Sequence, residues 1–330
     1  VNAYICHINQ MENVTVPTHF DMTLYKDQGS IRYVYFLFTI IVYLAILIFN
    51  TSIIVVVIKE KSLHEPMYIF ISCLCLNSLY GSSGLFPRLS IDLLSDYHLI
   101  TYPACFTQIY VIYTYTLSEL TVLATMAYDR YTAICQPLHY HNIMTMRMTA
   151  ALITASFSWA FFWKAIIVYI TVRLPLCGNG IIRVYCSTWS VVRLSCVPTG
   201  FNNAMGLSVV VMTIGLCVGF TLFSYVRILI VCKRSSSEIR GKALQTCLPH
   251  IITFVLYSLS FFCDIVLSRF DLNLAMKIVS YFFSLEFIVI PPLLNPLIYG
   301  LTLKSSVNCF NKNCDVILKP SVHLRFSITI

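Results

Sequence analysis

The sequence has few charged residues. Of its 330 residues, 11% are Asp, Glu, Lys or Arg and 58% are hydrophobic, whereas soluble domains carry about 25% charged residues. This shortage excludes an ordinary soluble protein, and the apolar runs leave no room for a separate soluble domain. Low-complexity segments and tandem repeats are also absent from the sequence. We therefore expect a membrane protein.

Seven apolar runs are long enough to cross a bilayer, which takes about 20 residues. Open sheet edges are not tolerated in lipid, so these runs are predicted to be helices. They cover residues 33–58, 66–86, 102–134, 148–172, 202–231, 243–263 and 276–299. Most of the 22 Lys and Arg residues are cytoplasmic if the amino terminus lies outside, as the positive-inside rule requires. The expected fold is an all-α membrane protein, a seven-transmembrane helix bundle in the plasma membrane.

The spans divide the chain into three parts. Residues 1–32 are expected to be extracellular, residues 33–300 to form the helix bundle and residues 301–330 to be a cytoplasmic tail. We expect translation to start at Met11, and Asn13 then lies in an Asn-Val-Thr glycosylation site near the outer terminus. The net charge of +8 is interpreted as topology and lipid contact, with no nucleic acid partner.

Fourteen cysteines are present, and most lie in the spans, where a free thiol behaves as a small hydrophobe. The outer side is an oxidising compartment in which disulfides persist. Four cysteines fall there and allow three pairings: Cys105, Cys177, Cys186 and Cys196. A metal site is not favoured, because no CxxC pair or nearby His accompanies them. After the last span, Cys309 and Cys314 are candidates for palmitoylation, with free thiols as the alternative.

The string MAYDRYTAICQPLHY at residues 126–140 ends the third apolar run. Charged side chains in or near a bilayer core cost about 2.5–3.5 kcal/mol each on insertion scales. The adjacent Asp129 and Arg130 therefore indicate a functional role and not a role in packing alone.

Three more strings occur at other places in the chain: LHEPMYIF at 63–70, KALQTCLPHIITF at 242–254 and PPLLNPLIYG at 291–300. Together with MAYDRY, they resemble the motifs of odorant receptors, a branch of the rhodopsin-like G protein-coupled receptors. The resemblance covers roughly residues 33–310. The strings LYGSSGLFP at 79–87 and KALQTCLPH at 242–250 are similar to the fish-type branch of that family.

The resemblance implies a receptor for small odorants that activates a heterotrimeric G protein of the stimulatory, olfactory type. It implies neither enzymatic activity nor a cofactor. In such receptors Arg130 would be held by Asp129 at rest and freed on activation, while Pro296 allows a kink. The switch residues carried over are Asp129, Arg130, Tyr131, Tyr225, Asn295, Pro296 and Tyr299. The alternative for Tyr225 and Tyr299 is an anchoring role in the aromatic belt of the membrane interface.

The resemblance also implies two disulfides, Cys105–Cys186 and Cys177–Cys196, which would pin the loop between spans four and five over the bundle. Family members often pair a Glu at the position of Glu119 with an Asp in span two, and the two resemble a sodium site. This chain has Ser78 where that Asp would fall, which puts the ion in doubt. The alternative is a neutral Glu119 that is hydrogen-bonded within the bundle.

Stripes at helical spacing in the outer halves of spans three, six and seven predict the ligand site. Apolar walls with a few polar groups suit a small-molecule pocket, and helix packing is the alternative. The stripes comprise Ile109, Ile112, Tyr113, Thr116, Phe261, Phe262, Ile265, Arg269, Tyr281, Leu285 and Ile288.

Charged residues near this site suggest the class of ligand. Arg269 and the nearby Lys277 favour an anionic group, and two hydrogen bonds from Arg269 would hold a carboxylate. An inward Glu286 would add an ammonium site and select an amino acid. The alternatives are an Arg269 in solvent or paired with Asp264 or Asp271, a Glu286 facing span one or two, and an outward Lys164.

Other classes of function fit less well. A transporter would favour inverted repeats or broken helices, which are not visible in the sequence. An intramembrane enzyme would need paired acids or a Ser/His arrangement at matching depth, and GxSxG is absent. Another rhodopsin-like receptor, for a peptide or an amine, is the runner-up. An amine receptor would want an acid on the outer half of span three, where Ile112 and Tyr113 lie.

Overall fold

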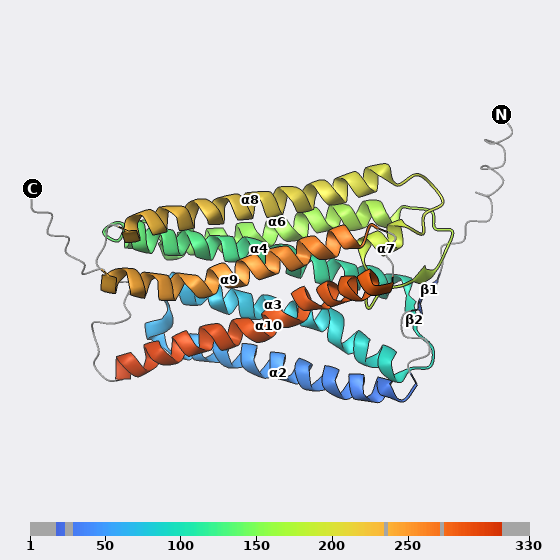
Figure 1. The fold of residues 1–330 in the computed structure, drawn as a ribbon, viewed down its shortest axis with the longest axis horizontal. Coiled ribbons are helices and arrows are strands. Elements are labelled where there is room, and N and C mark those ends of the chain that lie inside the picture. Colours follow the sequence, from blue (N-terminus) through green and yellow to red (C-terminus); the bar gives the residue numbers. More distant parts are fainter. Residues whose placement is uncertain (1–17, 24–28, 234–236, 271–273, 312–330) are drawn as a thin grey trace, which may run out of the picture.

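The structure is a computed structural model that describes residues 18–23, 29–233, 237–270 and 274–311. Within these residues, seven long helices lie side by side and form one bundle (Figure 1). They are α2 (Ile31–Lys59), α3 (Pro66–Leu94), α4 (Tyr102–Cys135), α6 (Met146–Val172), α8 (Gly200–Lys233), α9 (Ser237–Leu267) and α10 (Leu274–Asn311). Each contains one predicted span and extends beyond it. The 27 residues of α6 correspond to about 40 Å, more than the roughly 30 Å of a bilayer core.

Local signals set several of the helix ends. Pro66 occupies the first turn of α3, where its missing N–H costs nothing. The side chains of Thr101 and Thr145 accept hydrogen bonds from the backbone amides of Ala104 in α4 and Met148 in α6. Short elements lie between the long helices: η2 (Lys61–Leu63), α5 (Tyr140–Ile143) and α7 (Thr188–Val192).

The helices differ in their apolar character. Among the described residues, six helices are apolar enough to cross a membrane by length and composition, and α4 is the long helix outside this set. It carries Glu119, Asp129 and Arg130, and its faces contact α3, α6, α8, α9 and α10. Because these neighbours shield it from lipid, α4 can hold polar side chains that a lipid-facing helix cannot.

Two glycines let α3 approach α4 closely. A Cβ at Gly84 would lie 2.6 Å from Cγ1 of Val111, and a Cβ at Gly81 would overlap the ring of Tyr115. Gly215 on α8 has nothing within 4 Å of its Cβ position. The small residues on α3 therefore set the contact distance to the central helix.

A small sheet covers the outer end of the bundle, at the right of Figure 1. The strand β1 (His19–Met22) pairs antiparallel with β2 (Leu99–Thr101) and parallel with β3 (Gly180–Ile181). Phe20 and Met22 on one face of β1 are buried against Ile100 and Ile181. The loops that precede α4 and α8 are thus joined to the amino-terminal part of the chain.

Several predictions fall outside the described residues. They concern the start at Met11, glycosylation at Asn13, lipidation at Cys314 and the outer parts of the terminal segments. The side chains of Cys309 and Lys277 also lie outside the description.

Candidate functional site

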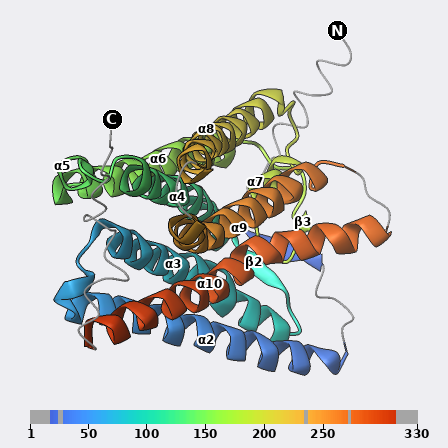
Figure 2. The same ribbon diagram turned by 60° about the vertical axis from the view of Figure 1, so that its left-hand side comes forward.

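The cytoplasmic end of α4 holds an ion pair between the buried Asp129 and the partly buried Arg130. Nε of Arg130 lies 3.0 Å from Oδ2 of Asp129, and the guanidinium also contacts this oxygen through its NH2 group. The hydroxyl of Tyr140 donates to Oδ1 of the same carboxylate at 2.8 Å. Burial and then the Asp129 charge raise the pKa of Tyr140, so its hydroxyl keeps the proton that it donates. Figure 2 shows α5, which begins at Tyr140, at this end of the bundle.

Two further predicted switch residues, Tyr225 and Tyr131, lie near the same end. Tyr225 is buried in a cluster with Ala127 and Cys247, and Tyr131 packs on Tyr128 and Phe223. The structure places Tyr225 inside the bundle, with 7% of its surface exposed, and not in an interfacial belt.

Tyr299 is also buried. Its ring stacks on His250 of α9, and its hydroxyl lies 3.0 Å from Nδ1 of this histidine. Pro296 lies one turn earlier, inside α10. The contact therefore joins α9 to the half of α10 that follows its proline.

Glu119 occupies the middle of the bundle. Its two carboxyl oxygens accept hydrogen bonds from Nδ2 of Asn77 and Nδ2 of Asn295, each at 2.8 Å. The two amides turn N–H groups towards Glu119, and Ser78 makes no hydrogen bond to it in the described structure. The arrangement agrees with the alternative, a carboxyl hydrogen-bonded within the bundle.

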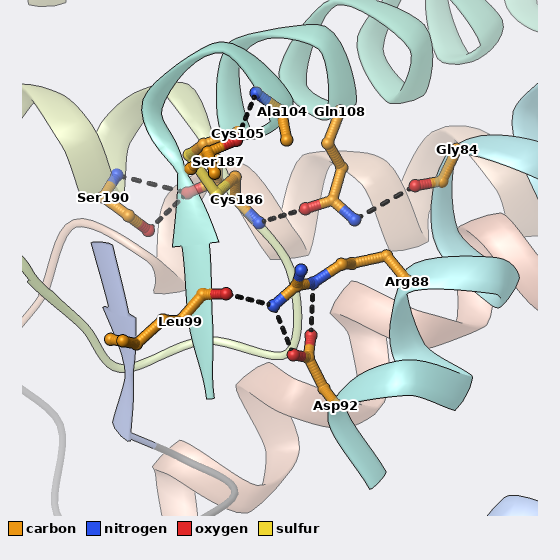
Figure 3. Close-up of a disulfide and its surroundings, with 11 residues drawn as sticks. Gly84, Arg88, Asp92, Leu99, Ala104, Cys105, Gln108, Cys186, Ser187 and Ser190 are labelled. Atoms are coloured by element: carbon orange, nitrogen blue, oxygen red, sulfur yellow. Dashed lines mark hydrogen bonds and ion pairs between the residues drawn. A yellow bond between two sulfur atoms is a disulfide. The ribbon is translucent and has the colours of Figure 1, made fainter. Parts of the chain in front are cut away.

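Two disulfides organise the loop between α6 and α8. One joins Cys105 in the first turn of α4 to Cys186, and the other joins Cys177 to Cys196. Gln108 supports the first, because its side chain accepts from the amide of Cys186 at 2.9 Å and donates to Gly84 of α3 at 3.0 Å (Figure 3).

The same close-up shows how β2 is attached to α3. Arg88 pairs with Asp92 and donates to the carbonyl of Leu99 at 2.8 Å (Figure 3). The loop between α6 and α8 is therefore held to α4 by a disulfide and by Gln108, and β2 is held to α3 by Arg88.

A buried ion pair lies below this loop. The NH1 group of Arg183 is 2.8 Å from Oδ1 of Asp264 on α9, and both side chains hydrogen-bond to Ser284 of α10. The exposed fractions of the two charged side chains are 9% and 3%. This contact joins the loop to α9 and α10 at once.

Most of the predicted ligand residues face the interior. Ile112, Thr116, Phe261 and Ile288 are buried, and the rings of Tyr113 and Phe261 lie 6.4 Å apart. Ile109 and Ile265 are also buried, while Tyr281 and Leu285 are half-buried. The outer halves of α4, α9 and α10 thus meet as the stripes predict.

Phe262 does not join them. It is 48% exposed on the outside of α9, whereas its neighbour Phe261 is fully buried. Adjacent helical residues point about 100° apart, so the two cannot share one face. The prediction that both line the site is therefore corrected for Phe262.

The charged candidates have distinct partners. Arg269 is half-buried, donates to Oδ1 of Asn203 and to the carbonyl of Ile265, and lies over the ring of Trp189. Its predicted partner Asp264 is instead taken by Arg183.

The other two candidates also differ from their alternatives. Glu286 is half-buried, and its carboxyl lies against Ser260 of α9 rather than span one or two. Lys164 faces inward, with 2% of its surface exposed.

Sequence reasoning missed several of these groups. Arg183, Asn77, Gln108 and Tyr140 lie outside the predicted stripes and motifs or were not singled out within them. Asp264 carried a usable signal, because an acid within an apolar span is a functional candidate by itself.

Seven membrane-spanning helices, an Asp-Arg pair at the cytoplasmic end and a disulfide-bonded outer loop define a seven-helix membrane receptor. The family model described as olfactory receptor matches residues 38–314. The chain therefore belongs to the olfactory receptor family, whose members are odorant receptors of the plasma membrane that couple to G proteins and are not enzymes.

Individual relatives have the same extent. Mouse olfactory receptor 4B13 is 36% identical over 285 residues, covering 84% of this chain and 90% of the relative. Mouse olfactory receptor 4E2 is 33% identical, covering 88% and 92%. Human olfactory receptor 4B1 is 34% identical, covering 84% and 88%. Each alignment thus covers more than four fifths of this chain and of the relative.

Proposed function

We propose that this receptor binds a small odorant between the outer halves of α4, α9 and α10 and activates a stimulatory heterotrimeric G protein through Arg130. The observation that carries the proposal is that α4 takes part in both regions. The ring of Tyr113 lies 6.4 Å from that of Phe261 in the outer half of the bundle, and Arg130 lies near the cytoplasmic end of the same helix. The two residues are about 25 Å apart along the helix axis, at 1.5 Å per residue.

The mechanism follows from what holds Arg130. Its guanidinium is paired with Asp129, whose second oxygen is taken by Tyr140. A ligand that favours another arrangement of α4, α9 and α10 shifts the population towards that arrangement. Release of Arg130 then gives the G protein a cation at the cytoplasmic face. Tyr299 and Pro296 lie on α10, one of the helices that would rearrange, and Tyr225 lies on α8, which packs against α4 and α9.

The ligand is expected to be small and to bind with moderate affinity. A molecule of about ten heavy atoms at ~0.8 kcal/mol per atom reaches about −8 kcal/mol, which is near micromolar. A carboxylate or an amino acid is the proposed class, because the cationic side chains of Arg269 and Lys164 lie in the outer part of the bundle. The fish-type assignment remains a prediction, since the relatives reported above are mouse and human receptors.

A receptor for a peptide or an amine is the second candidate. An amine ligand would need a carboxylate facing the site, and Ile112 and Tyr113 occupy the relevant part of α4. Glu286 is the half-buried acid that would have to supply this carboxylate, and it lies against Ser260. The olfactory family membership favours the odorant.

A ligand screen in transfected cells tests the proposal. Cells with measured surface receptor are exposed to acids, esters, alcohols, aldehydes and amines, and cyclic AMP is recorded. A rise at roughly micromolar concentrations of one class supports the proposal. A fall in cyclic AMP instead contradicts the stimulatory G protein, and a response at picomolar concentrations contradicts the small site.

A further inference from the structure

Lys164 is a lysine buried in the middle of a membrane helix. It lies on the inner stripe of α6, which also contains Ala160, Ile167 and Thr171. Its exposed fraction is 2%, so the side chain does not extend to the membrane surface. A buried ammonium is costly unless its charge is compensated.

The neighbours of Lys164 carry no negative charge. Nζ donates to the hydroxyl of Thr188 in α7 at 2.6 Å and lies 4.1 Å from the ring centroid of Tyr113. The hydroxyl satisfies one N–H of the ammonium, and the ring face attracts its charge weakly. Within the described residues, no carboxylate lies within ion-pair distance of Nζ.

The other buried charged side chains have partners of their own. Among the described lysines and arginines, Lys164 and Arg183 are the buried ones, and Arg183 is paired with Asp264. The buried acids have other partners: Asp92 has Arg88, Asp129 has Arg130, and Glu119 has two amides. Lys164 is thus the buried cation of this set that no acid neutralises.

Lys164 also lies beside the proposed ligand site. Tyr113, whose ring it covers, packs against both the apolar cluster of the bundle and the cluster under the outer sheet. Ile109 belongs to one of these clusters, and Ile112 and Phe261 to the other. An apolar body of a few carbons fits this surrounding, with its charged end towards Lys164.

We infer that Lys164 is the anchor for a carboxylate group on the ligand. This inference rests on the proposed function, because it assumes that the odorant binds in the outer half of the bundle. It places the anion on α6, and not at Arg269, whose guanidinium already donates to Asn203 and Ile265. The carboxylate supplies the negative charge that the surroundings of Lys164 lack. It also accepts hydrogen bonds from the remaining N–H groups of the ammonium.

The test compares matched compounds on matched variants of the full chain. Straight-chain carboxylic acids, their methyl esters, and the corresponding alcohols, aldehydes and amines are applied to the wild type, Lys164→Met, Lys164→Arg and Arg269→Ala. Lys61→Met, at an exposed position of η2, is the control. Surface receptor and cyclic AMP are measured for each variant.

The expected result is a selective loss of acid potency. Acids activate the wild type at lower concentrations than esters, and Lys164→Met raises the half-maximal acid concentration by about 10- to 100-fold, as for one charged hydrogen bond. Responses to alcohols and esters stay within about threefold. Lys164→Arg retains part of the acid preference, and Lys61→Met leaves it unchanged.

Other outcomes overturn the inference. Equal potency of acids and esters on the wild type does so without any variant, even if Lys164→Met fails to reach the surface. Acid potency that depends on Arg269 and not on Lys164 also overturns it. So does activation by aldehydes with a complex that borohydride traps, which would mean an imine formed from a neutral Lys164 with loss of water. If esters or alcohols activate and acids do not, the proposed function survives and the anchor fails. If a surface-expressed wild type answers no compound, both fail.

Discussion

The two ends of the bundle each contain an arginine–aspartate pair whose acid is buried, but the pairs are built differently. Asp129 and Arg130 are consecutive residues of α4. Arg183 and Asp264 lie 81 residues apart and join the outer loop to α9, with Ser284 of α10 bonded to both. The first pair can separate without moving any helix relative to another. The second cannot separate without detaching a loop from two helices.

This difference teaches which end is fixed and which can switch. At the outer end, disulfides, a sheet and a long-range ion pair constrain the loop over the bundle. At the cytoplasmic end, the described residues show Arg130 bonded to Asp129 of its own helix, and Asp129 accepting one hydrogen bond from a hydroxyl of α5. Changes at the outer pair should therefore reduce folding, and changes at the cytoplasmic pair should mainly reduce signalling.

The largest expected effect on folding comes from Asp264→Ala. Removal of the acid leaves Arg183 buried and unpaired, which typically costs about 3–5 kcal/mol. We expect little receptor at the cell surface, measured by antibody binding on intact cells. The double variant Arg183→Met with Asp264→Leu should recover part of the loss, because both charges are then removed. A double variant worse than either single one would contradict the pairing.

The next effect is expected from Cys105→Ser or Cys186→Ser. A disulfide that closes a long loop contributes about 2–4 kcal/mol, a large share of a marginal stability. Both variants should be retained inside the cell, whereas Cys73→Ala, at a free thiol of α3, should reach the surface. Non-reducing peptide mapping should show Cys105 linked to Cys186. A link from Cys105 to Cys177 or Cys196 would refute this arrangement.

Arg130→Ala should separate folding from signalling. The hydroxyl of Tyr140 still donates to Asp129, so we expect surface receptor close to the wild type and no ligand-driven cyclic AMP. Adding Tyr140→Phe removes that donor and should lower surface receptor, since a buried acceptor left unsatisfied costs about 1–3 kcal/mol. Normal signalling by Arg130→Ala at the surface would end the mechanism proposed here.

The smallest effect is expected from Asp96→Asn at the exposed outer rim. The hydrogen bond from Arg32 and then its charge lower the pKa of Asp96. A lowered pKa stabilises the folded state above the unfolded value of about 3.9 and loses that contribution as the pH falls through the folded value. Heat inactivation of purified receptor should therefore differ slightly between wild type and variant at pH 7, and the difference should disappear below about pH 4. A difference that grows on acidification would contradict the assignment.

The sequence predicted the helices well, because each span is a long apolar run. Such a run can be recognised in the sequence without knowing which other segments it packs against. All seven spans lie inside observed helices, and the largest difference is at the end of α10, which reaches Asn311 where the predicted span ends at residue 299. The motif at 126–140 predicted the Asp129–Arg130 pair, since the two are neighbours in the chain.

Contacts between distant segments were harder to predict. Nothing local in the sequence pairs Arg183 with Asp264 or turns Asn77 towards Glu119, because such contacts depend on how helices and loops pack. The prediction for Phe262 was wrong for a related reason. Residues of one stripe share a helix face, whereas the neighbouring residues Phe261 and Phe262 point in different directions. Inward placement of Lys164 likewise required the bundle, since an isolated helix allows the side chain to reach the surface.

The sheet at the outer end also imposes an order in time. The strand β1 is made early, but its partner β3 belongs to the loop before α8. About 160 residues separate the two, so at 5–20 residues per second the ribosome needs roughly 8 to 30 seconds to supply the partner. The strand β1 can therefore pair with β2 once two helices have been inserted, and its pairing with β3 waits until four helices have been inserted. Tags or extensions placed before β1 would act on this late step of biogenesis.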